Sequence, residues 1–392
     1  MKQSLCSYRL YSLENTFIVS AAHHRLYFLS QLLSPDSNLL PTPPKKVIIY
    51  LSSCASVDYF SHIFPSFLPK SYLLIPLHGK QSPNTRSKGF AKFTASHLQK
   101  SILLTTDLAA RGLDIPAVDL VVQLDGPPTD PKVFLHRCGR AGRAGRRGIA
   151  VLFLSPGKEE EYIDFLAVRK TPVTKFELHS SEQTVHEQTK EIVRGMREAV
   201  KRDRAIWEKG LKAFVSHVRA YTKHMTQAIF RTRDIDWPAL VEAYALLTIP
   251  AMPELRRVGA GAGNEGPITF NLPTLDLVTF AYKDLAQEKS RLAALAAGST
   301  PYGITPGEMA RRKATSEQKK AAQKRNMAWS NKKEGNNRKE EGREKRKRKR
   351  ERSRPEEEKV KEREWRELVE AVKRRKRDGE EVGNGPKWES LD

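Results

Sequence analysis

Five short apolar runs constrain the fold of this chain more than any other feature. They are KVIIYL at 46–51, YLLIPL at 72–77, SILLT at 101–105, DLVVQL at 119–124 and GIAVLFL at 148–154. Each has the length and the apolar, β-branched content of a buried strand. Stretches with helical spacing, such as 56–64 and 86–93, lie between them. Apolar strands that alternate with helices predict one α/β domain over residues 12–170, built on a parallel sheet flanked by helices.

A helical extension is expected over residues 171–255. Apolar side chains recur there at the period of an amphipathic helix, at Trp207, Leu211, Phe214, Val218, Tyr221 and Met225. A second, shorter set before Pro250 consists of Trp237, Leu240, Val241 and Tyr244. We expect a small helical domain, centred on about 195–255, that packs on the sheet domain. Residues 256–310 are expected to form a linker and a partly helical segment, flexible at the glycine-rich stretch 259–266.

The positive charge of the chain is concentrated near its C-terminus. The 392 residues carry a net charge of +23, and residues 311–350 alone hold 18 Lys and Arg against 5 Glu. Large apolar residues are sparse from about residue 300 onward, so we expect a basic, largely disordered tail over 311–392, with a transient charged helix near 360–377. A basic excess of this size favours a polyanionic partner such as nucleic acid.

The densest part of this tail has three interpretations. Eight of the ten residues 343–352 are Lys or Arg. Such a tract screens RNA phosphates and releases counterions without reading sequence, and it serves equally well as a nuclear import signal. A solvated linker is the third interpretation.

The cysteines and the hydropathy of the chain exclude several classes of protein. Cys6, Cys54 and Cys138 lie far apart and form no CxxC pair, so neither a disulfide framework nor a metal site is predicted. No apolar run approaches the roughly 18 residues that a membrane span needs, and the N-terminus lacks a long apolar signal core. These features predict a soluble intracellular protein with no membrane partner.

Two motifs carry the chemistry. TTDLAARGLDIP at 105–116 follows a predicted strand, where backbone amides, hydroxyls and an arginine can converge on phosphates at the carboxyl edge of a parallel sheet. HRCGRAGR at 136–143 places Arg137, Arg140 and Arg143 at three-residue spacing, which predicts one shared helical face suited to bidentate phosphate contact. A Gly-Arg repeat by itself is more typical of a flexible basic segment. The pairing of the two motifs is what favours a catalytic role.

Together these motifs resemble motifs V and VI of the DEAD-box RNA helicases. IIYLSS at 48–53 resembles the motif IV strand of that family, and VDLVVQLD at 118–125 resembles the strand that follows motif V. Arg86 falls where the family has a motif IVa arginine, although Pro83 stands where a glutamine is usual. The resemblance implies a RecA-like helicase C-terminal domain.

The resemblance also implies roles for the residues of these motifs. The RNA backbone is held by Thr106, Asp107, Arg111, Gly112 and Arg86. Asp114 reaches the ribose of ATP, and Arg140 and Arg143 are arginine fingers that stabilise the charge building on the γ-phosphate. The RNA and ATP sites are coupled through His136, Arg137 and Gln123. His136 is expected to order the start of its helix, and a purely structural histidine is an equal alternative.

The ATP-binding motifs of such a helicase do not occur in this sequence. There is no G-x-x-x-x-G-K-[ST] string, whose backbone amides cradle phosphates, and no Asp-Glu-Ala-Asp. ATP and Mg²⁺ are therefore expected to be bound mainly by an N-terminal RecA-like domain that activity requires. We expect residues 1–11 to be a truncated remnant, the chain to be a fragment or the product of a truncated gene model, and this chain alone to be inactive.

Further segments resemble one subgroup, the ATP-dependent DEAD-box RNA helicases that assemble the large ribosomal subunit. They are DPKVF at 130–134, EEEYIDFLAVRKT at 159–171, KGLKAFVSHVRAY at 209–221 and FAYKD at 280–284. The resemblance implies pre-rRNA and pre-60S particles as partners, in the nucleus and nucleolus. The alternative is a non-enzymatic RNA-binding assembly protein that retains only the second helicase domain. A DNA translocase fits the two motifs less well.

Overall fold

The computed structural model describes residues 13–37, 39–95, 99–109, 115, 118–142, 148–178, 180–255, 270–300, 302–303 and 305–325, with isolated positions in the tail. The chain forms two compact units, which divide between Leu275 and Asp276. No helix in the described part of the chain has the length and apolar character that crossing a membrane requires.

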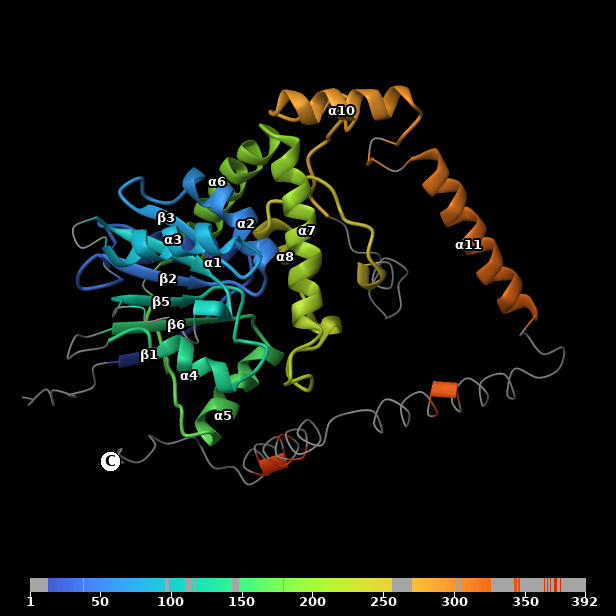
Figure 1. Ribbon diagram of the computed structural model, residues 1–392. Helices are drawn as coiled ribbons and strands as arrows, with labels where there is room; N and C mark the ends of the chain where they lie inside the picture. Colours follow the sequence, from blue (N-terminus) through green and yellow to red (C-terminus); the bar gives the residue numbers. More distant parts are fainter. Residues whose placement is uncertain are drawn as a thin grey trace, which may run out of the picture. The chain divides into compact units, whose positions relative to one another are not determined.

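The first unit is built on a sheet of seven parallel strands (Figure 1). In chain order the strands are β1 (Leu13–Val19), β2 (Lys46–Tyr50), β3 (Leu73–Leu77), β4 (Ser101–Thr105), β5 (Leu120–Gln123), β6 (Gly148–Leu154) and β7 (Thr174–Lys175). Their spatial order is β3-β4-β2-β5-β6-β1-β7. The predicted parallel α/β sheet is confirmed, and each of the five predicted strands agrees with the observed one to within one residue at either end.

Strands β1 and β7 were not predicted from the apolar runs. In β1 buried and partly exposed residues alternate, so its sequence LENTFIV contains no continuous apolar run. It lies between β6 and β7 and pairs in parallel with both. Strand β7 has only two residues, and both are exposed. The sheet therefore extends further on this side than the apolar runs indicate.

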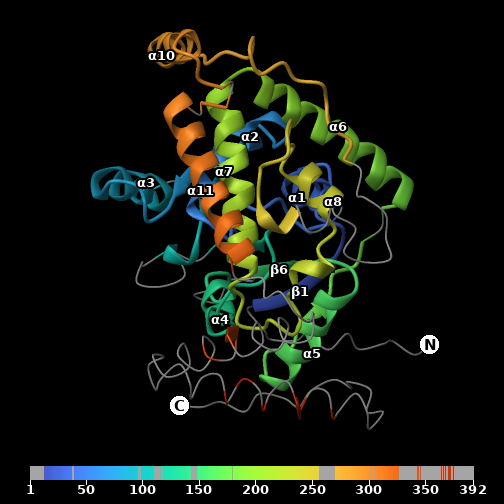
Figure 2. The same ribbon diagram turned by 90° about the vertical axis from the view of Figure 1, so that its right-hand side faces the viewer.

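Helices cover both faces of the sheet. They are α1 (His24–Leu33), α2 (Cys54–Ile63), α3 (Pro83–Ala95), α4 (Lys132–Cys138) and α5 (Glu161–Val168). Connections between parallel strands are almost always right-handed. Because the chain runs in one direction across the sheet from β1 to β3 and then turns back, α1 lies on the face opposite α3 and α4, as Figure 2 shows.

Three further helices of this unit pack on α1 and α2. They are α6 (Glu182–Lys201), α7 (Arg204–Tyr221) and α8 (Trp237–Ala243). Helix α6 packs against α1, and α7 runs along α2. The approach of α7 is close at Gly210, where a Cβ atom would lie 3.0 Å from the Tyr59 ring. The predicted helical extension, packed on the sheet domain, is confirmed.

The predicted length and buried face of α7 need correction. The helix ends at Tyr221, so Met225 lies in the turn that follows, where its side chain is exposed. The backbone N–H of Met225 donates to the carbonyl oxygen of Thr129 at 3.0 Å, which takes this segment out of the helical hydrogen-bond pattern. Gly210 and His217 are buried on the packed face, whereas Leu211 is only half-buried.

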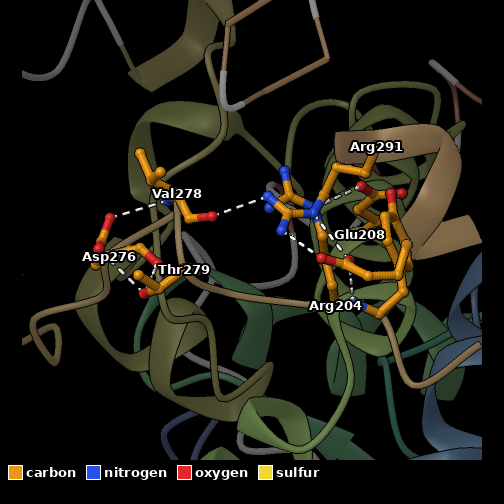
Figure 3. A network of polar contacts seen from close by, with 8 residues as sticks. Arg204, Glu208, Asp276, Val278, Thr279 and Arg291 are labelled. Atoms are coloured by element: carbon orange, nitrogen blue, oxygen red, sulfur yellow. Dashed lines mark hydrogen bonds and ion pairs between the residues drawn. The ribbon is translucent and has the colours of Figure 1, made fainter. Parts of the chain in front are cut away.

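The second unit contains α10 (Leu285–Ala296) and α11 (Pro306–Arg325). The Asp284 carboxylate caps α10 by accepting hydrogen bonds from the backbone N–H groups of Ala286 and Gln287. Before this helix, Asp276 accepts from the N–H of Val278, whose carbonyl accepts from Arg291 at 2.9 Å (Figure 3).

Helix α11 reaches into the first residues of the tail predicted over 311–392. Its sequence is rich in Ala, Lys, Arg, Gln and Glu, which are strong helix formers and need no buried core to favour helical geometry. The glycine-rich stretch 259–266 lies outside the described residues, as do most of the basic tail and of the transient helix predicted near 360–377.

Candidate functional site

Arg137 joins the two sequence motifs. Its guanidinium is 3% exposed and lies in the last turn of α4. Nε donates to Oδ1 of Asp107 at 2.6 Å, and Nη1 donates to Oε1 of Gln123 at 3.1 Å. The ring of Tyr50 lies beneath it, with the guanidinium carbon 4.9 Å from the ring centroid. The segment that follows β4 is thus tied to α4 and to the carboxyl end of β5.

Gln123 is the inner member of this network and is fully buried. Its amide nitrogen donates to Sγ of Cys138 at 3.4 Å, so both ends of the side chain have partners. Burial raises the pKa of the Cys138 thiol to about 12, which keeps the sulfur neutral. Because Arg137 offers only donors, the amide oxygen of Gln123 must face it, and this fixes the orientation of the amide.

Arg140 lies beyond the end of α4. The helix stops at Cys138, and the next residues form a short bridge in which Ala141 pairs with Val118. The Arg140 carbonyl accepts from the N–H of Val118 at 3.2 Å, and the Arg140 side chain is 7% exposed. The predicted helical face shared by Arg137 and Arg140 was therefore wrong, because the helix ends between them.

Gly148 supports this bridge from the start of β6. A Cβ atom at Gly148 would lie 2.1 Å from the backbone nitrogen of Gly142, closer than any real contact. Only glycine lets the two backbone segments approach so closely. The tight packing at this point holds Val118, Ala141 and Arg140 in place.

The other predicted site residues fall in different places. Thr106 is half-buried directly after β4, next to Asp107. Arg86 is half-buried on α3. His136 is exposed in the last turn of α4, so the expectation that it orders the start of that helix was wrong. The remaining residues, Arg111, Gly112, Asp114 and Arg143, lie outside the described part of the chain.

A second network, which the motifs did not indicate, anchors α7 at the carboxyl ends of β2 and β5. The hydroxyl of Ser52 donates to Oδ2 of Asp125 at 2.7 Å and lies 2.9 Å from Nδ1 of His217. Burial alone would raise the pKa of the Asp125 carboxyl, but the charge and hydrogen bond of His217 and the bonds from Ser52 outweigh it and lower that pKa. The sequence signal for this contact is a histidine on the apolar face of α7.

The C-terminal end of α7 is fixed in the same way. The hydroxyl of Tyr221 donates to Glu159 at 2.9 Å, and the other oxygen of Glu159 accepts from the N–H of Ser155, just beyond β6. Arg25 from α1 lies 3.7 Å from the same carboxylate. A small pocket lined by Ser52, Asp125, Pro127, Thr129, Glu159, His217, Ala220, Tyr221, His224 and Phe230 lies between α7 and the strand ends. The extension therefore covers this edge of the sheet.

No group of three or more clustered carboxylates is present among the residues that the structure describes. Arg140 is the predicted ATP contact among them, and its backbone is held by Val118. An arginine at this position can contact a phosphate through two parallel N–H groups.

Comparison with known families accounts for this arrangement. Residues 27–145, which include Asp107, Gln123, Arg137 and Arg140, match the helicase conserved C-terminal domain. Residues 203–252 match the C-terminal extension of ATP-dependent rRNA helicase SPB4-like proteins, and residues 282–386 match the C-terminal tail of the same proteins. The chain carries an SPB4-like helicase C-terminal domain, extension and tail. The resemblance to DEAD-box RNA helicases of the ribosome-assembly subgroup is confirmed.

Individual SPB4-like relatives agree with this assignment. The chain is 48% identical over 375 residues to the ATP-dependent rRNA helicase spb4 of Sclerotinia sclerotiorum, which covers 93% of this chain and 56% of the relative. It is 50% identical over 285 residues to SPB4 of Phaeosphaeria nodorum, covering 72% of this chain and 42% of the relative. The chain thus spans about half the length of the curated relatives that it matches.

Among solved structures, the chain is similar to domain 2 of the Mss116p DEAD-box helicase bound to an RNA duplex. The identity is 24% and the TM-score is 0.49, covering 66% of this chain and 98% of that chain. Helices α7 and α8 fall within the matched extension, so the contact of His217 with Ser52 joins the two matched regions.

Proposed function

We propose that this chain supplies the second RecA-like half of an ATP-dependent RNA helicase that acts on pre-rRNA during assembly of the large ribosomal subunit. The observation that carries the proposal is the network of Asp107, Arg137 and Gln123. It joins the segment after β4, where the RNA backbone would bind, to the α4 end that leads to Arg140. A single buried cation therefore binds a residue of the proposed RNA site and lies in the helix that leads to Arg140.

On the RNA side, we propose that Thr106, Asp107, Arg111, Gly112 and Arg86 hold the RNA backbone. The side chain of Asp107 is 43% exposed although it is bound to Arg137, so one face of it is open to a ligand. Thr106 lies directly beside it at the carboxyl end of β4. Contacts to phosphate and sugar fix register without reading sequence, which suits an enzyme that acts on many RNA segments.

On the nucleotide side, Asp114 would bind the ribose of ATP, and Arg140 and Arg143 would act as arginine fingers. ATP supplies the phosphoryl group whose negative charge increases during transfer, and a guanidinium stabilises that charge. ATP and Mg²⁺ would be bound mainly by an N-terminal RecA-like domain. His136 is exposed beside Arg137 on α4, so a role in coupling would act through contact with that domain.

The test is RNA-stimulated ATP hydrolysis by the chain alone and by the chain joined to the N-terminal RecA-like domain of the S. sclerotiorum relative. We expect no turnover from residues 1–392 alone and turnover from the joined protein. Arg140→Lys keeps the positive charge but loses the planar guanidinium, so it should reduce turnover strongly, by about 10³-fold or more if Arg140 is an arginine finger. His62→Ala, on the exposed side of α2, is the matched control.

ATP hydrolysis by the isolated chain would contradict the proposal, and RNA binding without turnover in the joined protein would favour a non-enzymatic assembly protein.

The basic tail is proposed to add sequence-tolerant RNA affinity and to direct the protein to the nucleus and nucleolus. Its Lys and Arg density supports both uses. Deleting residues 332–352 should weaken RNA binding and reduce its dependence on salt, as measured by fluorescence anisotropy at several salt concentrations. RNA affinity that is insensitive to salt and to this deletion would exclude the RNA-binding role of the tail.

A further inference from the structure

Three histidines converge where α1 meets α6. His23 precedes α1 and His24 is its first residue, whereas His186 lies in the first turns of α6. One ring nitrogen from each lies within 4.8 Å of those of the other two. The ring centroids of His23 and His24 are 4.1 Å apart, and the ring of His186 stands nearly perpendicular to that of His24 at 6.1 Å. The three side chains come from segments about 160 residues apart, which the packing of α6 on α1 brings together.

Two of these rings have nitrogen atoms that lack partners. Nδ1 of His23 and Nε2 of His24 are inaccessible to solvent and accept or donate no hydrogen bond within the described part of the chain. A buried polar atom left in this state destabilises the folded protein. Imidazole nitrogens that gather without hydrogen bonds are the arrangement that a metal ion satisfies, because neutral imidazole is the commonest metal ligand.

The charges around the cluster favour a cation. The carboxylates of Glu182 and Glu242 act on His24, and that of Asp236 acts on His23. Glu182 stands four residues before His186 on α6, which places the two side chains on the same side of the helix. Its carboxylate is not among the ligand atoms that lie within 4.8 Å of one another, so Glu182 would have to move to become a fourth ligand.

We propose that His23, His24 and His186 bind one divalent transition-metal ion, with Zn²⁺ as the preferred ion, and that this ion fastens α6 to α1. Three imidazoles with a carboxylate or water complete the four-coordinate geometry that Zn²⁺ adopts. Zn–N bonds are about 2.0–2.1 Å long, so the rings must rotate toward the ion. The exposed side chain of His186 has room for this rotation.

The position of the site gives the ion a structural role. In the sequence, α6 lies between two matched regions. Residues 27–145 match the helicase domain, and residues 203–252 match the extension. A metal ion bound by histidines of both α6 and α1 would hold α6 against the sheet domain, just before the chain enters α7. The cysteines of the sequence gave no indication of this site, because all three proposed ligands are histidines.

The experiment uses the tag-free 392-residue chain, stripped of metal with a chelator and then dialysed. Isothermal titration with Zn²⁺ measures affinity and stoichiometry, and visible absorption of the Co²⁺-loaded chain reports coordination geometry. His186→Ala removes one ligand from an exposed position, and His62→Ala removes an exposed histidine from α2 as the matched control. Thermal unfolding with and without Zn²⁺ provides a second readout.

We expect stoichiometric Zn²⁺ binding and intense Co²⁺ absorption typical of four-coordinate sites in the wild type and in His62→Ala. His186→Ala should bind at least about tenfold more weakly and should lose the rise in Tm that Zn²⁺ gives the wild type. Excess Mg²⁺ should not compete, because it prefers oxygen ligands. If His186→Ala does not fold, His186→Gln replaces it. Absence of binding in the wild type, or equal binding in the wild type and the His186 variant, would overturn the proposal.

Discussion

The guanidinium of Arg137 has partners that lie far from it in the sequence. Asp107 is 30 positions away and Gln123 is 14 positions away, and both bind it directly. The sequence motifs assigned Asp107 to RNA contact and Arg137 with Gln123 to coupling, but motif spacing does not specify hydrogen bonds. The contact exists because α4 crosses the sheet beside the ends of β4 and β5. The proposed coupling would therefore act through one buried cation.

The first prediction concerns the inner partner of this cation. Gln123→Leu keeps the approximate size of the side chain but leaves Nη1 of Arg137 without its acceptor. Loss of a buried hydrogen bond to a charged group should lower the free energy of unfolding by about 1–3 kcal/mol, measured by urea denaturation. Gln227→Leu is the exposed control and should change that free energy by less than about 0.5 kcal/mol. Equal effects of the two substitutions would show that the network does not stabilise the fold.

At the scale of elements, buried parallel strands were predictable and partly exposed ones were not. Strands β2, β4 and β5 are almost wholly buried, so each appears as an apolar run, whereas the alternation in β1 does not. Helix α6 was predictable in principle, because its buried residues Val185, Thr189, Val193, Met196 and Val200 follow helical spacing. The packing of α7 on the strand ends was not predictable, because it depends on contacts of His217 and Tyr221 with polar groups from three loops.

The turn after α7 gives a prediction about pH. His224 is buried against Phe230, and burial, followed by the charge of Arg137, lowers its pKa to about 3. The unfolded chain takes up a proton near pH 6.5, but the folded protein does not, so stability is lost as pH falls below that value. By pH 5 this histidine alone should lower the free energy of unfolding by about 2 kcal/mol.

The measurement is denaturant unfolding of the wild type and of His224→Gln between pH 7 and pH 5. The glutamine variant should be less stable at pH 7 because it repacks the turn, but its free energy of unfolding should depend less on pH. His23 and His24 also have lowered pKa values and contribute to the pH dependence of both proteins. An identical slope in the two proteins would contradict the buried, neutral state of His224.

At the scale of the whole molecule, a helicase C-terminal domain is joined to an SPB4-like extension and tail. The sequence predicted this order of parts, because the motifs and the later segments each resemble the same subgroup. It did not predict α11, where helix-forming side chains outweigh the absence of a core. It also could not show that the extension covers the carboxyl edge of the sheet. That contact places α7 beside the strand ends from which the proposed site is built.

The most direct measurement is the RNA stimulation of ATP hydrolysis by the chain joined to an N-terminal RecA-like domain, compared between the wild type and Asp107→Asn. Asparagine keeps the shape of the side chain but removes the charge that Arg137 and the proposed RNA site share. The account predicts that RNA no longer stimulates hydrolysis by the variant, while its basal rate and its circular dichroism spectrum stay unchanged. Wild-type stimulation in Asp107→Asn would contradict the claim that this contact connects the two sites.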